Sequence, residues 1–143
     1  MCVKIRRATI EDAENICEIS KKDLGYECDI NLVKERVASL DEMRECVFIA
    51  EFDNSVVGYV HVEKYNILYC ESMINILGLA VDEDYQRRGI GRALIQAVER
   101  WGRELGINKV RLNSGALRKE AHAFYRAIGF DSEKEQIRFI KEI

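Results

Sequence analysis

The chain has 143 residues, of which 48% are apolar and 33% charged, and a formal net charge of −3. This length suits one domain, expected over residues 1–143, and the composition is that of an ordinary globular protein. The isoelectric point near 5.5 argues against a nucleic-acid binder that works by bulk positive charge. Because no apolar run approaches the roughly 18 residues of a membrane span, we expect a cytoplasmic protein without a membrane partner.

The cysteines are odd in number, scattered along the chain and without the spacing of a metal site. They are Cys2, Cys17, Cys28, Cys46 and Cys70. In a reducing compartment such residues are mostly small, buried, apolar side chains. We therefore expect neither a metal nor a redox role for them.

The N-terminal part of the chain predicts one strand followed by two helices. Val3 to Ala8 alternates apolar and basic residues, as a strand with one covered face does. Thr9-Ile10-Glu11-Asp12 is typical of a capping box at a helix start, and Gly25 suits the end of that helix. The second helix begins near Asp29. Its inward face is expected to carry Leu32, Val33, Val37 and Leu40.

Two further strands are predicted over Cys46 to Phe52 and over Val56 to Lys64. Alternation places His61 and Glu63 on the same side of the second of these strands. A histidine beside a carboxylate suits acid–base chemistry. A partly buried histidine that is bonded to its neighbours explains the pattern equally well, so both interpretations stay open.

The middle of the chain predicts a buried strand, a short polar turn and an amphipathic helix. The strand is the aliphatic run from Ile74 to Val81, and Gly78 within it marks a bulge or a close approach of another backbone. Apolar residues then recur every three or four positions from Ile90 to Leu105, which places them on one helix face.

The turn before this helix contains Arg87, Arg88, Gly89 and Gly91. A helix start has unpaired backbone N–H groups and the positive end of the helix dipole, so this junction can hold a phosphate or a pyrophosphate. Neither the G-x-G-x-x-G dinucleotide fingerprint nor a P-loop is present. The plain alternative is a solvated connection between strand and helix.

The C-terminal part of the chain predicts three further elements. Asn108 to Asn113 is expected to form a fifth strand and Arg118 to Ile128 the last helix. Phe130 to Ile143 fits a terminal hairpin of two strands.

Two segments resemble the motifs of one enzyme family. Gln86-Arg87-Arg88-Gly89-Ile90-Gly91, preceded by Leu79-Ala80-Val81, resembles the acetyl-CoA pyrophosphate loop of the GNAT superfamily of N-acetyltransferases. Ala121-His122-Ala123-Phe124-Tyr125-Arg126-Ala127-Ile128-Gly129-Phe130 resembles the A-x-x-F-Y-x-x-x-G-F segment of its last helix. A small bacterial subgroup of the family is similar at Ser114-Gly115, Arg118, Ala121-His122, Phe124-Tyr125 and Phe139-Ile140-Lys141.

The resemblance implies an α/β fold with a mixed, splayed sheet of about seven strands flanked by four helices. It also implies acetyl-CoA as the co-substrate. In the family the fourth strand splays from the fifth, and the edge groups of Leu79 and Val81 then bond the amides of the pantetheine arm. The residues that the resemblance places against acetyl-CoA are Leu79, Ala80, Val81, Gln86, Arg87, Arg88, Gly89, Ile90, Gly91, Arg92, Ser114, Arg118, His122 and Tyr125.

Acetyl transfer from a thioester to an amine needs a donor for the oxyanion and a proton for the departing thiolate. The simplest oxyanion donor is the backbone N–H of Leu79. The resemblance places Tyr125 at the general-acid position of the family, and a phenol with a reference pKa near 10 stays protonated at neutral pH. The alternative is a core tyrosine that packs beside Phe124 and Phe130.

The amine must also lose a proton before it attacks. Many relatives have a glutamate on the fourth strand for this purpose, and counting back from Leu79 places Asn75 there. An asparagine cannot take up a proton at neutral pH, although it can hold a water that does. Glu63, His61 or a chain of waters could act instead, so the base stays open.

These patterns predict an acetyl-CoA-dependent N-acetyltransferase that acts on a primary amine of a small molecule, a peptide or a protein. In the family the first two helices cover the acceptor pocket, so Asp23, Tyr26 and Asp29 are candidate acceptor contacts, or else parts of a solvated loop. The resemblance is compatible with a homodimer. The competing interpretation is a non-catalytic regulatory module that binds acyl-CoA.

Overall fold

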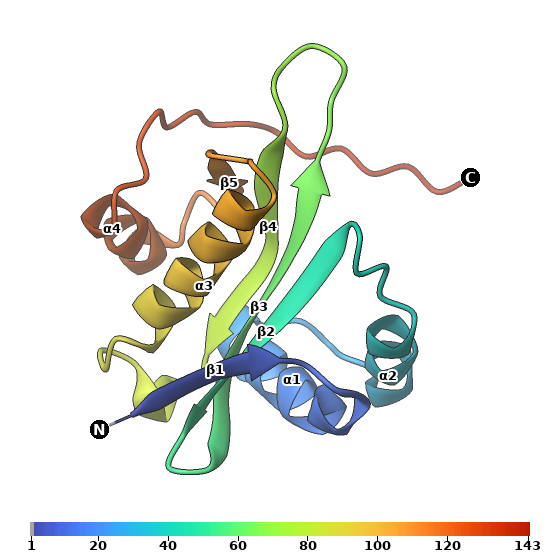
Figure 1. Ribbon diagram of the computed structural model, residues 1–143, viewed down its shortest axis with the longest axis vertical. Coiled ribbons are helices and arrows are strands. Elements are labelled where there is room, and N and C mark those ends of the chain that lie inside the picture. The colour runs from blue at the N-terminus through green and yellow to red at the C-terminus, as the bar shows by residue number, and fades with distance from the viewer. Residues whose placement is uncertain (1) are drawn as a thin grey trace. The chain divides into compact units, whose positions relative to one another are not determined.

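The computed structural model describes residues 2–143 (Figure 1). The chain divides into two compact units, Met1–Leu112 and Asn113–Ile143. The first contains the sheet and three α-helices, and the second contains one α-helix followed by a segment without regular structure. None of the helices over residues 2–143 combines the length and the apolarity that a bilayer-spanning segment requires.

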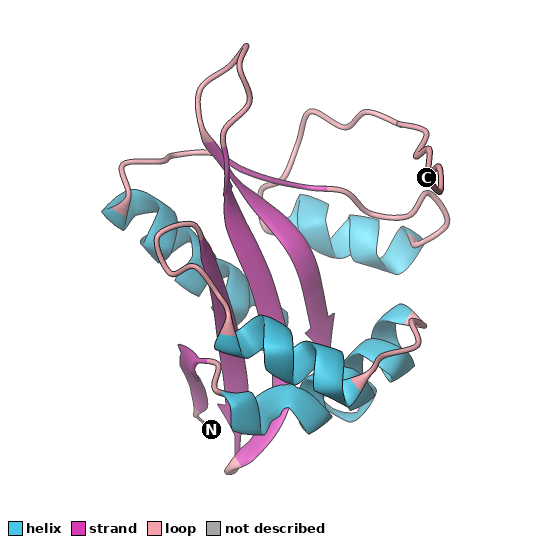
Figure 2. Cartoon of the chain, turned by 90° about the vertical axis from the view of Figure 1, so that its right-hand side faces the viewer, coloured by secondary structure: helices cyan, strands magenta, loops and turns pink. Residues whose placement is uncertain are grey.

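The sheet of the first unit is mixed. Its strands, in the order in which they lie side by side, are β1 (Val3–Arg7), β2 (Glu45–Phe52), β3 (Ser55–Tyr65), β4 (Met73–Val81) and β5 (Val110–Leu112). Strands β1 to β4 run antiparallel to their neighbours and β5 is parallel to β4. Figure 2 shows them as one twisted layer. The predicted class is confirmed, but the described residues hold five strands, fewer than expected.

Within residues 2–143 there are four α-helices, as predicted. They are α1 (Ala13–Ile19), α2 (Ile30–Ala38), α3 (Ile90–Glu104) and α4 (Lys119–Ala127), with short helical turns η1 (Ile10–Asp12), η2 (Ser20–Leu24, a π-helical turn) and η3 (Glu83–Tyr85). The predicted capping box is present, because Asp12 Oδ2 accepts from the Thr9 N–H at 2.7 Å. Helix α2 begins after Asp29, near its predicted start, and Asp29 Oδ1 caps it by accepting from the Asn31 N–H at 2.8 Å.

Two helices cover opposite faces of the sheet. On β3, Gly58 faces α3, because a Cβ placed there would lie 3.3 Å from the side chains of Ile90 and Leu94. The next residue, Tyr59, belongs to a buried cluster with Ile19 of α1. Successive strand residues point to opposite faces, so α3 and α1 lie on either side of the sheet (Figure 1).

The interior differs from the sequence prediction at three side chains. Leu32 was expected on the inward face of α2 and is 46% exposed. Cys17 and Cys46 are buried, and burial raises the pKa of these thiols to about 12 and about 11. Cys2 and Cys70 are exposed, because they lie before β1 and in the connection between β3 and β4 instead of inside elements.

A β-bulge interrupts β4 at the predicted glycine. On β3, His61 pairs with Gly78 and the next residue, Val62, pairs with Ile76. Strand β4 therefore holds one extra residue, Leu77, which is 48% exposed. Pairing between β4 and β5 covers only Ile74 to Ile76 on β4. Beyond the bulge, no described strand pairs with that edge of β4.

The second unit is less regular than predicted. Helix α4 begins after Arg118 and ends before Ile128, close to its predicted bounds. The predicted hairpin over Phe130 to Ile143 is wrong: this segment contains no strand, as the loop colour in Figure 2 shows. Ile137 and Phe139 are 81% and 86% exposed. No Gly or Asn follows Gly129 to form a tight turn, and an isolated two-stranded hairpin is marginal in water.

Candidate functional site

The start of α3 is an open cradle of backbone N–H groups. Arg87 (φ +65°) and Gly89 (φ +80°) both have left-handed backbone conformations, and Gly89 is the N-cap. No side chain caps this helix start, and its first turn contains no acidic residue. The Ala93 N–H donates to the Gly89 carbonyl at 3.0 Å and closes the first turn of α3, so the N–H groups before Ala93 lie at the positive end of the helix. The predicted strand–turn–helix context is confirmed, and it suits an anion.

Arginine side chains surround this cradle. Arg87, Arg88 and Arg92 are all exposed. The Arg88 guanidinium carbon lies 5.5 Å from the ring centroids of both Phe52 and Tyr85, which form an aromatic pair of their own. The aromatic pair therefore holds the positive charge of Arg88 beside the loop.

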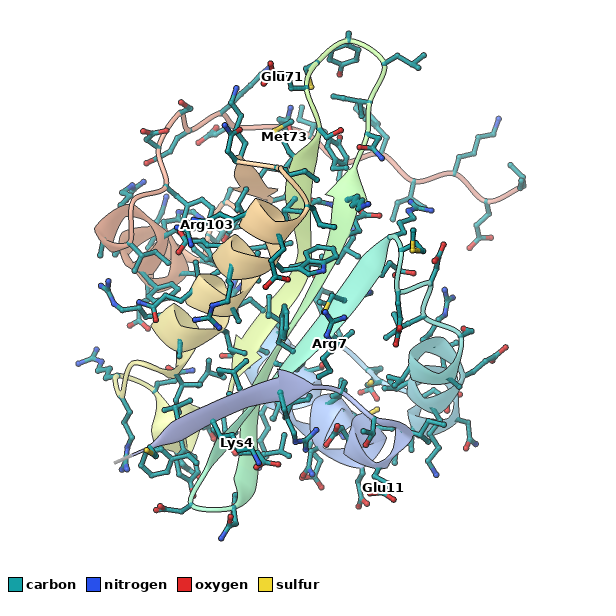
Figure 3. The ribbon with its side chains drawn as sticks, in the orientation of Figure 1. Lys4, Arg7, Glu11, Glu71, Met73 and Arg103 are labelled. Atoms are coloured by element: carbon teal, nitrogen blue, oxygen red, sulfur yellow. The ribbon has the colours of Figure 1, made fainter. Side chains whose placement is uncertain are left out.

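The edge of β4 next to this loop is open to an extended ligand. The Asp82 N–H donates to the Val57 carbonyl at 2.7 Å, so the peptide groups of Leu79 and Val81 point to the opposite side, away from β3. That is the side on which β5 stops at the bulge. Met73, labelled in Figure 3, begins β4, and the loop follows Val81 at the opposite end of the strand.

The two backbone groups of Val81 are already bonded to side chains. Asp23 Oδ2 accepts from the Val81 N–H at 3.3 Å. The Gln86 amide Nε2 donates to the Val81 carbonyl at 3.3 Å and to Asp23 Oδ1 at 3.1 Å. The prediction that Val81 presents free edge groups is therefore wrong for this structure. Asp23 and Val81 are 58 residues apart, and no local pattern announces the contact.

A row of polar side chains crosses the sheet at the place of the predicted base. Glu63, Asn75 and Arg111 are register partners on β3, β4 and β5. The Asn75 amide donates to Glu63 Oε2 at 2.9 Å, and Arg111 Nη1 donates to Asn75 Oδ1 at 2.7 Å. Arg44 also donates to Glu63, at 3.2 Å. Asn75 is buried, and its side chain connects the carboxylate to the guanidinium.

Sequence reasoning found Glu63 and Asn75 but missed the two arginines. Their only signal is position: Arg111 interrupts the aliphatic pattern of a short strand, and Arg44 immediately precedes β2. The Arg111 guanidinium carbon lies 4.6 Å from the centroid of the Tyr65 ring, and this contact further fixes the Arg111 side chain.

His61 and Glu63 do not bond to each other and have different hydrogen-bond partners. His61 Nε2 donates to Glu45 Oε1 on β2 at 3.0 Å, whereas Glu63 is bonded to Arg44 and Asn75. The interpretation of His61 as a partly buried histidine bonded to a neighbour fits this arrangement. Glu63 is the carboxylate that lies next to the β4 position of the family's base.

Within the second unit, Tyr125 is surrounded by aromatic rings. Its ring centroid lies 5.5 Å from that of Phe124 and 5.6 Å from that of Phe130, and the side chain is half-buried. The predicted packing of this tyrosine is present, and it fixes the orientation of the phenol.

The N-terminal end of α4 contains the other predicted ligand contacts. Arg118 is the N-cap and is exposed, and His122 Nε2 donates to the Gly115 carbonyl at 2.9 Å. Ser114 Oγ is buried and has no hydrogen-bond partner among the described residues. A buried hydroxyl without a partner is costly, so a ligand group at Ser114 would remove that cost.

Residues 10–130 match the Acetyltransferase (GNAT) family. The chain belongs to this family. Membership makes it an N-acetyltransferase with acetyl-CoA as co-substrate, and it confirms the family that the two motifs indicated.

Named relatives of this GNAT chain differ in how much of their length it spans. Human N-acetyltransferase 8 is 32% identical over 92 residues, which are 64% of this chain and 40% of that relative. The aminoglycoside N(6')-acetyltransferase type 1 of Stenotrophomonas maltophilia is 30% identical over 140 residues, 94% of this chain and 90% of its own length. A solved structure of AAC(6')-Iy in complex with the bisubstrate analog CoA-S-monomethyl-acetylneamine shares the fold, with a TM-score of 0.84, 21% identity and full coverage of both chains.

The residues of the first unit fit acetyl-CoA on two observations. The start of α3 presents uncapped N–H groups with arginines beside them. The edge of β4 beyond the bulge has no strand partner among the described residues. Both are what a phosphorylated, amide-bearing ligand would use.

Proposed function

We propose that the chain acetylates a primary amine of a small molecule by direct transfer from acetyl-CoA. The observation that carries this proposal is the meeting of the open β4 edge with the uncapped start of α3 in one unit. Acetyl-CoA supplies the acetyl group as an activated thioester. The chain itself then needs to hold the ligand, orient the amine and move two protons.

Tyr125 is proposed as the proton donor to the departing sulfur. The phenol is an O–H donor, and the packing of its ring against Phe124 and Phe130 limits the directions in which it can point. The Leu79 N–H, on the open side of β4, is the proposed donor to the carbonyl oxygen.

Glu63 is proposed as the proton acceptor for the amine, with Asn75 as the residue that orients it. The Asn75 amide fixes one carboxylate oxygen of Glu63 at 2.9 Å, and Arg111 fixes Asn75 in turn. In this proposal Glu63 on β3, the register partner of Asn75, takes the role of the glutamate that was expected on β4. Asn75 cannot accept a proton but can hold the group that does.

An aminoglycoside or a related amino sugar is the proposed acceptor class. The relative from Stenotrophomonas maltophilia, of which this chain covers 90%, is named for that activity and supports the choice. Peptide amines are the alternative, and a homodimer is compatible with either. Asp29, a predicted acceptor contact, is assigned to capping α2, while Tyr26 is 64% exposed.

Release of free thiol from acetyl-CoA, measured across aminoglycosides, amino sugars, linear polyamines and lysine peptides, tests this function. Turnover is expected with an amino sugar, and Tyr125→Phe, which keeps the ring packing, is expected to lower kcat about 10²-fold without weakening CoA binding. Calorimetric binding of CoA with no thiol release from any amine would instead support the non-catalytic regulatory module.

A further inference from the structure

Asp23 and Gln86 make the contacts to Val81 that an added strand would make. A strand laid along the β4 edge would accept a hydrogen bond from the Val81 N–H and donate one to its carbonyl. The Asp23 carboxylate accepts from that N–H at 3.3 Å, and the Gln86 amide donates to that carbonyl at 3.3 Å. A bond of 3.1 Å between the two side chains closes the ring.

The two side chains can leave Val81 by rotating about their own bonds. Gln86 is exposed and Asp23 is half-buried. Asp23 lies in η2, whose backbone is anchored on both sides: the Ser20 hydroxyl bonds the buried Tyr59 hydroxyl at 2.6 Å, and Leu24 packs on the buried cluster. Asp23 therefore releases Val81 by a change of rotamer, without movement of the turn.

We propose that Asp23 and Gln86 form a latch on the acetyl-CoA site, which occupies the Val81 edge until the pantetheine arm displaces it. The proposal rests on the proposed function, because it takes the β4 edge as the place of that arm. The latch weakens apparent affinity, since only the fraction of molecules with the latch open can bind.

The size of the effect follows from the bonds that are lost. Opening the latch breaks two long hydrogen bonds to Val81, one from its N–H to a carboxylate and one from an amide to its carbonyl. Such a latch is closed in most molecules, and opening it permanently is expected to tighten binding about tenfold. The nucleotide end of the ligand has no need of the Val81 edge, so a probe without pantetheine is expected to be insensitive to the removal of Asp23.

Calorimetric titration of the full chain with CoA compares wild type, Asp23→Ala and the control Glu27→Ala. Glu27 is exposed on the same connection, so its removal changes the net charge equally and leaves Val81 untouched. Asp23→Ala is expected to bind CoA about tenfold more tightly than Glu27→Ala. The two variants are expected to bind adenosine 3',5'-bisphosphate, which lacks the pantetheine arm, with equal affinity.

Other outcomes decide against the latch. If the affinity of Asp23→Ala for CoA equals that of Glu27→Ala or is lower, Asp23 does not compete with the ligand and the proposal is wrong. If it tightens the bisphosphate as much as CoA, the effect is one of charge, and the proposal is also wrong. Asp23→Leu, which keeps the approximate size but cannot accept a hydrogen bond, serves if the alanine variant does not fold. Wild type that binds neither probe contradicts the proposed function itself.

Discussion

At the scale of single residues, the proposed base lies one strand away from the position at which the resemblance predicted a carboxylate. Asn75 occupies the β4 position where relatives were expected to have a glutamate, and the carboxylate of Glu63 lies one strand away at the same register. Cross-strand register partners have Cβ atoms about 5 Å apart, so the shift of the carboxylate is small. The sequence could suggest both residues but not the Arg111 and Arg44 contacts that fix them, because those depend on which strands become neighbours.

This arrangement predicts the effect of Glu63→Gln. The amide keeps the size of the side chain and its bond to Asn75 but cannot take up a proton, so kcat/KM is expected to fall about 10²-fold in the thiol-release assay. Glu45→Gln, which alters the partner of His61 on the same sheet, is the control. An equal loss in that control would assign the base to His61 instead.

At the scale of elements, two glycines on neighbouring strands have different roles. A Cβ on Gly58 would lie 3.0 Å from the Ala80 carbonyl oxygen and 3.3 Å from the side chains of Ile90 and Leu94, so this glycine lets α3 pack closely on β3. A Cβ on Gly78 would lie no closer than 3.7 Å to the Tyr59 hydroxyl. The sequence suggested that Gly78 marks either a bulge or a close approach. The structure shows the bulge there and the close approach at Gly58.

We therefore expect Gly58→Ala to lower the free energy of unfolding by about 1–3 kcal/mol, because rigid backbone and packed side chains must shift. Gly78→Ala is expected to change it by less than about 0.5 kcal/mol, since an ordinary contact replaces open space. Urea unfolding followed by circular dichroism compares the two variants. A larger loss at Gly78 would mean that the bulge itself requires glycine.

At the scale of the whole molecule, the sequence predicted what depends on local pattern. The order of the first five strands and four helices, the capping box at Asp12 and the turn before α3 all follow from periodicity and capping residues within a few positions of each other. The contacts that were missed join distant positions: Asp23 with Val81, and Asn75 with Arg111. Such pairs become visible only when the strands and helices are assembled.

The packing of β4 beside the start of α3 predicts that the co-substrate raises the thermal stability of the folded chain. A ligand that binds only the folded chain stabilises it by RT ln(1 + [L]/Kd), about 2.7 kcal/mol at a hundredfold excess over Kd. Because the proposed contacts on β4 and at the start of α3 exist only when both elements are folded, CoA at that excess is expected to raise Tm by about 10 °C. Differential scanning calorimetry with and without CoA measures the shift, with adenosine 5'-monophosphate at the same concentration as the control. A shift no larger than that of the control would show that the β4 edge adds nothing to the binding of the co-substrate.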